Sequence, residues 1–172
     1  MNLKLNLFLV SGLLVVTGCA GPDSGTPGSA GTSEPTGKQY LAATEPAGAI
    51  PVGQARTETV DGNVAALVGY IGGSAEPFVN GLAAFTIVDP GIEACPADCG
   101  CPTPWDYCCT LDQLPGNIAT VKVVDPRGQP LAEDARPLLG VREMALVVVE
   151  GTVQLDDQGN LSILARKVFV RN

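Results

Sequence analysis

Five of the six cysteines in this chain fall within 15 residues: Cys95, Cys99, Cys101, Cys108 and Cys109. Thiols at this density form disulfides in an oxidising compartment, or bind thiophilic metal ions as thiolates. The 172 residues include no histidine, which excludes Ser-His-Asp and Cys-His nucleophiles, imidazole metal ligands and c-type haem attachment. Sulfur chemistry is therefore the main chemistry that the sequence offers.

Structural disulfides are the leading interpretation of this segment, and on this interpretation no cofactor is needed. Because five is an odd number, at least one thiol is free or pairs with another molecule. A ring between the adjacent Cys108 and Cys109 would be strained, so these two residues are expected to bond to different partners. Bridges from Cys95 and from Cys101 or Cys99 to this pair are one plausible choice, and the sequence does not select the connectivity.

Two alternatives use the same five cysteines differently. The first is a thiolate site for copper or zinc. The spacing C-x3-C-x-C-x6-C-C lacks the paired C-x2-C turns of zinc ribbons, and clustered thiolates suit Cu(I). The second alternative is thiol redox exchange, although the Cys-X-X-Cys spacing typical of that chemistry is absent.

Five β-rich segments must position the cysteines. They are residues 64–71, 82–88, 118–124, 145–155 and 161–170. Turn residues separate them, and the Gly159-Asn160 dipeptide predicts a hairpin between the last two. The cysteine-rich segment is the connection between the second and third.

The connection between the third and fourth segments contains the best candidate for a helix. It covers residues 131–144 and is interrupted by Pro137 and Gly140. Five strands with a longer, helical connection at this point match the layout of an OB-fold barrel, which we favour over a small sandwich. The predicted fold class is thus all-β, a small five-stranded OB-like barrel.

The last strand contains a change in pattern. Its apolar residues alternate as far as Ala165 and then shift by one position, which predicts a β-bulge at Arg166-Lys167. Such a bulge bends a strand as closure of a small barrel requires. Residues 149–153 and 161–170 also resemble the closing strands of bacterial envelope OB-fold proteins, in a loose pattern.

The amino terminus has the pattern of a secretory signal peptide, residues 1–18. Lys4 precedes a short apolar run, and Val16-Thr17-Gly18-Cys19 resembles the lipobox of bacterial lipoproteins. The resemblance implies cleavage before Cys19, a diacylglycerol on its thiol and a membrane anchor in the cell envelope. Ala20, which follows, implies the outer membrane facing the periplasm rather than the inner membrane.

The chain after the anchor divides into a linker and one domain. Residues 19–39 are mostly Gly, Ser, Thr and Pro, and we expect a flexible linker because they cannot bury enough apolar surface to fold. The domain then covers residues 40–172, with a core from about residue 56. Residues 40–54 either pack along this domain or continue the linker.

The charge of the chain limits its partners. A formal net charge of −8 argues against nucleic acid, since phosphate backbones are held by Lys and Arg. We expect a non-catalytic, lipid-anchored binding module with no catalytic residue, which contacts the membrane through its anchor and an envelope protein or cell-wall polymer through its domain. Trp105 and Tyr107 are the candidate binding surface, and packing of Trp105 against the barrel end is the alternative.

Overall fold

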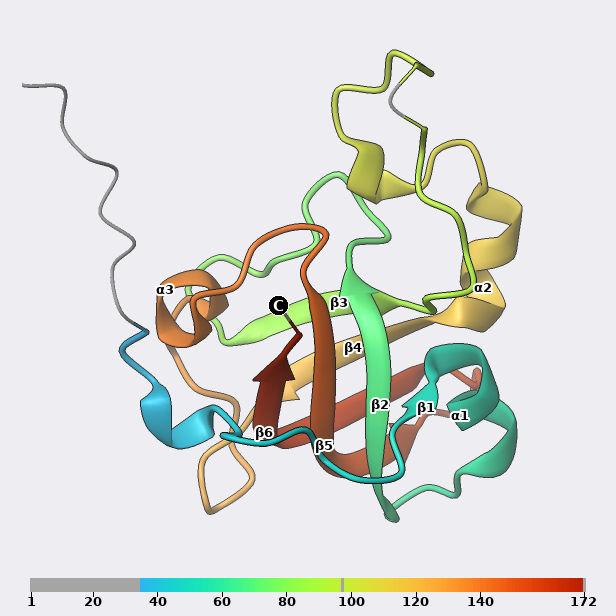
Figure 1. The fold of residues 1–172 in the computed structure, drawn as a ribbon. Coiled ribbons are helices and arrows are strands. Elements are labelled where there is room, and N and C mark those ends of the chain that lie inside the picture. The colour runs from blue at the N-terminus through green and yellow to red at the C-terminus, as the bar shows by residue number, and fades with distance from the viewer. Residues whose placement is uncertain (1–34, 97, 172) are drawn as a thin grey trace, which may run out of the picture. The chain divides into compact units, whose positions relative to one another are not determined.

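The computed structural model describes residues 35–96 and 98–171, and within them six strands form one sheet that closes on itself (Figure 1). The strand order is β1-β2-β3-β4-β6-β5, and β5 also pairs with β2. The expected signal peptide, Cys19 and most of the expected linker lie outside the described residues. The strands are β1 (Ile50–Pro51), β2 (Val64–Ile71), β3 (Ala84–Val88), β4 (Ile118–Val123), β5 (Leu146–Leu155) and β6 (Leu161–Val170).

The five long strands have the topology of an OB-fold. The pair β4 and β6 is parallel, whereas β2–β3, β3–β4, β5–β6 and the closing pair β2–β5 are antiparallel. This arrangement makes a closed five-stranded barrel, to which the two residues of β1 add a short parallel strand beside β2. The predicted small all-β, OB-like barrel is confirmed.

The bulge predicted in the last strand is present in β6. Lys167 pairs with Glu150 and Ala165 pairs with Gly151, so Arg166 is the extra residue between them. The inward-facing side chains change register at this point, from Ala165 to Val168. The strands approach so closely here that a Cβ on Gly151 would clash with the carbonyl oxygen of Leu164.

The barrel core continues into two short helices. In α1 (Val52–Glu58), Val52 and Ala55 are fully buried against the strand side chains. In α3 (Ala135–Leu139), three apolar residues join the same core. The side chain of Asp134 caps the start of α3, and Gly140 ends it at φ +68°, so this helix is shorter than the predicted candidate at 131–144. Helix α1 was not predicted.

The domain begins earlier than the sequence pattern suggests. The backbone N–H groups of Thr36 and Gly37 donate to the carbonyl oxygens of Pro137 and Leu138, at 3.2 and 2.8 Å. The chain is therefore hydrogen-bonded to the domain from Thr36 onward, within the segment that the sequence pattern assigns to the linker. Residues 40–54 pack along the domain, which was one of the two expectations for them.

Candidate metal centre in the cysteine loop

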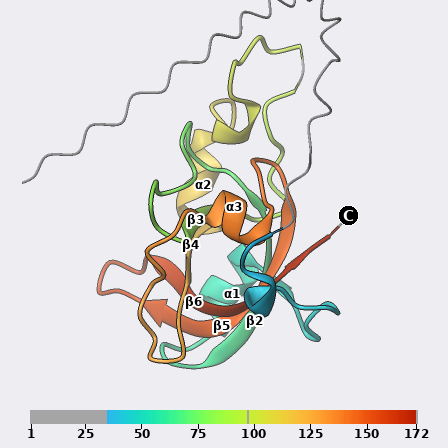
Figure 2. The same cartoon turned by 90° about the vertical axis from the view of Figure 1, so that its left-hand side faces the viewer.

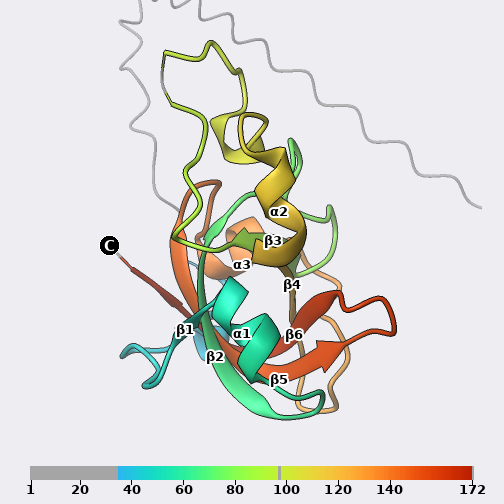
Figure 3. The same ribbon diagram turned by 90° about the vertical axis from the view of Figure 1, so that its right-hand side faces the viewer.

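The cysteine loop, residues 95–109, connects β3 to β4 as predicted and extends beyond the strand ends (Figures 1, 2 and 3). Helix α2 (Leu114–Asn117) leads from the loop into β4. Backbone hydrogen bonds fix its base: Gly73 N–H donates to the Trp105 carbonyl at 2.7 Å, and Cys95 N–H donates to the Pro104 carbonyl at 3.2 Å. The two arms of the loop are thereby held together next to the barrel.

Tyr107 anchors the base of the loop and is not a binding surface, so this prediction is wrong. Its side chain is 0% exposed and packs with Val88 and Leu114 in a small apolar cluster. The backbone at Tyr107 has φ +58°, in the left-handed region that non-glycine residues rarely adopt. The hydroxyl is buried without a hydrogen-bond partner among the described residues. Burial, with smaller contributions from the charges of Tyr70 and Cys95, raises the pKa of Tyr107 to about 12.

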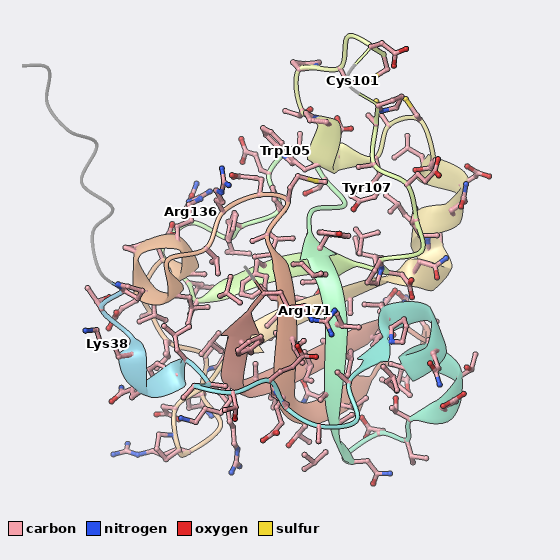
Figure 4. The ribbon with its side chains drawn as sticks, viewed as in Figure 1. Lys38, Cys101, Trp105, Tyr107, Arg136 and Arg171 are labelled. Atoms are coloured by element: carbon pink, nitrogen blue, oxygen red, sulfur yellow. The ribbon has the colours of Figure 1, made fainter. Side chains whose placement is uncertain are left out.

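The sequence left open whether Trp105 is an exposed binding surface or packs against the barrel end, and its environment in the structure is intermediate between the two. It is half-buried, and its indole N–H donates to the carbonyl oxygen of Ala75 at 3.1 Å. One side of the residue lines an open groove of about 840 Å³ at the barrel end, together with Tyr70, Met144 and Arg171. Figure 4 shows Trp105 and Tyr107 nearer to the sheet than Cys101. Of the two aromatic residues proposed as a surface, Trp105 lines this groove and Tyr107 does not.

The five cysteines converge, as their spacing led us to expect. The Sγ of Cys108 lies 2.8 Å from that of Cys101, 3.1 Å from that of Cys95 and 4.0 Å from that of Cys109. All five are free thiols, and no described sulfur pair is at the disulfide bonding distance of about 2.05 Å. The proximity is therefore confirmed, whereas the expected bridges are not formed in this structure.

Two sets of side chains in the loop have donor atoms that can hold a metal ion. The first comprises Cys95, Cys99, Cys101 and Cys109, whose sulfurs all lie within 4.8 Å of one another. Four sulfurs at about 2.3 Å from a tetrahedral zinc ion are about 3.8 Å apart, so this set needs only a small contraction to bind one. The second set comprises Cys95, Asp106 and Cys108, whose donor atoms also lie within 4.8 Å of one another.

Hydrogen bonding among the thiols favours a thiolate at Cys95. The bond with Cys108 is the largest influence, and it lowers the pKa of Cys95 to about 7. In return, hydrogen bonding to Cys95 raises the pKa of Cys109 to about 12, and hydrogen bonding with Cys108 raises the pKa of Cys101. Cys95 is also the buried member of the cluster, 6% exposed. Among the loop thiols whose pKa is shifted, Cys95 is the one in which the thiolate is favoured.

Asp106 belongs to the site and was missed in the sequence. Its carboxylate accepts hydrogen bonds from the Thr103 hydroxyl at 2.7 Å and from the Cys108 backbone N–H at 2.8 Å. These two bonds, the first the stronger influence, lower the pKa of Asp106 below its ordinary value. The sequence feature that could have identified Asp106 is its position, two residues before the Cys108–Cys109 pair.

In the described part of the chain, no helix has the length and hydropathy to cross a bilayer. The sequence matches no protein-family model, and a search of curated proteins finds no similar one. The geometry of the cysteine loop is therefore the basis on which a function can be assigned.

Proposed function

We propose that this protein is a lipid-anchored envelope protein that binds a thiophilic metal ion, zinc or Cu(I), through its cysteine loop and catalyses no reaction. The observation that carries the proposal is the set of four thiol sulfurs within 4.8 Å of one another. Tetrahedral thiolate sets of this kind bind zinc, and thiolate clusters also bind Cu(I).

A bound metal ion would connect the two arms of the loop. The four thiols of this set come from both arms of the loop, Cys95 to Cys101 on one and Cys109 on the other, so one ion would tie the arms together. Outside its base the loop has little apolar packing, and Cys99 and Cys109 are exposed. The binding free energy of a metal ion would order such a segment, because ligands that are loose without the ion become fixed around it.

The anchor is proposed from the amino-terminal pattern. A basic residue, a short apolar run and the lipobox-like Val16-Thr17-Gly18-Cys19 support lipidation at Cys19. Two or three acyl chains hold a protein on a membrane stably. In this position the loop would meet metal ions outside the cytosol. Outer-membrane attachment, facing the periplasm, is the location we propose.

The proposed anchor is tested by changing Cys19 to Ala. We expect the variant to appear in the soluble envelope fraction, because it has no thiol to receive the diacylglycerol. Cys99→Ser provides the matched control, since it removes a cysteine from the loop and leaves the lipobox unchanged. Recovery of Cys19→Ala with the membranes, to the same extent as Cys99→Ser, would contradict the anchor.

The metal-binding function is tested on the full chain purified from the envelope in detergent, without reductant or chelator. We expect at least one equivalent of zinc or copper by elemental analysis. Alkylation should modify all five loop thiols once the protein is denatured in chelator. A metal-free protein in which denaturation exposes a single loop thiol would overturn the proposal in favour of two disulfides. Retention of metal by Cys99→Ser at the full wild-type level would also contradict it.

A further inference from the structure

Cys108 is the thiol that the four-cysteine set leaves out. It is also the sulfur with the closest neighbours, 3.1 Å from Cys95 and 2.8 Å from Cys101. A structural zinc ion takes four ligands, so the fifth thiol has no place on the first ion. Cys108 nevertheless has a second donor beside it, the carboxylate of Asp106.

The carboxylate of Asp106 is held in place from within the loop. Oδ2 accepts from the Thr103 hydroxyl, and Oδ1 accepts from the Cys108 backbone N–H. Oδ1 also lies 3.8 Å from the Sγ of Cys95. These contacts fix the carboxylate facing Cys95 and Cys108 without help from a metal ion, which reduces the cost of ordering it as a ligand.

The second set, Cys95, Asp106 and Cys108, offers two sulfurs and one oxygen. Zinc accepts both thiolate and carboxylate ligands, whereas Cu(I) selects soft sulfur ligands. Three protein ligands leave the fourth position of a tetrahedral ion open to water or to a ligand from outside. The chemistry of this set therefore favours zinc over copper.

We propose that the cysteine loop binds two zinc ions that share the thiolate of Cys95. One ion occupies the closed set Cys95, Cys99, Cys101 and Cys109, and the other occupies the open set Cys95, Asp106 and Cys108. Binding replaces the protons of the five thiols, which pass to solvent, and no electrons are transferred. The inference rests on the proposed function for its first site and goes beyond it in ion count, metal identity and the role of Asp106.

The experiment is a zinc titration of the full chain in detergent, followed by native mass spectrometry. The wild-type chain is expected to bind two zinc ions, and Asp106→Asn and Cys108→Ser one each. Asp98→Asn removes an exposed carboxylate from the same loop and should still bind two. Cys19→Ser removes the cysteine outside the loop and should also bind two.

Each outcome separates the two proposals. A wild-type chain that stops at one zinc ion overturns the second site and leaves the proposed function standing, whereas a chain that binds none overturns both. Two ions retained by both Asp106→Asn and Cys108→Ser would also overturn the second site. If either variant fails to fold, a cobalt titration of the wild-type chain tests the second site instead. The second equivalent of cobalt should increase the thiolate-to-cobalt charge-transfer absorption. No increase after the first equivalent would contradict the proposal.

Discussion

The barrel and the cysteine loop are stabilised by different means. The barrel has a continuous ladder of strand pairs around an apolar core, with α1 and α3 packed into that core. The loop has a buried anchor, Tyr107, a few backbone hydrogen bonds and five thiols that no bond joins. The fold therefore fixes the base of the loop through Tyr107 and backbone hydrogen bonds, whereas no bond between its sulfurs holds the tip.

The largest expected effect lies in the barrel. Gly151→Ala should lower the free energy of unfolding by about 4 kcal/mol, near the upper end for one substitution, because the new Cβ would clash with the backbone of Leu164 and Ala165. Urea denaturation measures the change. Gly116→Ala is the matched control, since a Cβ there meets nothing within 4 Å, and it should stay within about 0.5 kcal/mol of wild type. Equal effects for the two variants would show that the close approach of the strands at Gly151 does not determine the loss.

Removal of metal should affect the loop and spare the barrel. When the free zinc concentration is a hundredfold above the dissociation constant, zinc bound by the four cysteines would stabilise the folded loop by about 2.7 kcal/mol. Chelation would remove this contribution. Hydrogen exchange should therefore accelerate in residues 95–109 and remain unchanged in β5. Acceleration in both regions together would show that the metal site and the barrel unfold as one unit.

A smaller effect is expected at the junction of the two regions. Tyr107→Phe removes a buried hydroxyl that has no partner among the described residues, so it should leave stability unchanged or raise it by about 1 kcal/mol. A loss of more than about 1 kcal/mol would reveal a hydrogen bond to that hydroxyl.

The same variant tests the pH dependence. The pKa of Tyr107 is raised from 10.0 to about 12 in the folded protein, so its neutral form favours folding. This stabilisation is fully present below pH 10 and is lost as the pH rises from about 10 through 12. Urea denaturation at pH 9 and pH 11 should show a steeper decline for wild type than for Tyr107→Phe. Identical declines would contradict the burial of the phenol.

The smallest effect is expected at the amino-terminal boundary. Deleting residues 21–34 should leave the melting temperature of the domain unchanged. Deleting residues 21–39 should lower it, because Thr36 and Gly37 are lost with their hydrogen bonds to the residues of α3. Equal melting temperatures for the two deletions would show that this segment contributes nothing to the fold.

The strands were predictable because their signals are local. Residues 64–71 and 161–170 carry β-rich apolar runs between turn residues, and the shift after Ala165 located the bulge of β6. Helix α1 gave no such signal, since it is short and buries only Val52 and Ala55. Its position depends on packing against the barrel, and a local sequence pattern carries no information about that packing.

The candidate site was predictable only in part. The spacing of the cysteines predicted that they would meet, but their bonding depends on oxidation and metal supply as well as on sequence. Burial of Tyr107 depends on its packing with Val88 and Leu114, which lie outside the cysteine loop, so the local sequence did not reveal it. The carboxylate of Asp106 comes close to Cys95 only when both arms of the loop fold back on each other, so this proximity could be seen only in three dimensions.

The central claim is that thiolates of the cysteine loop bind metal. X-ray absorption spectroscopy at the metal edge, on the full chain purified from the envelope, tests it most directly. Sulfur should dominate the first coordination shell, at a metal–sulfur distance of about 2.3 Å if the ion is zinc. A shell of oxygen and nitrogen alone at about 2.0–2.2 Å, or a protein that carries no metal, would contradict the claim.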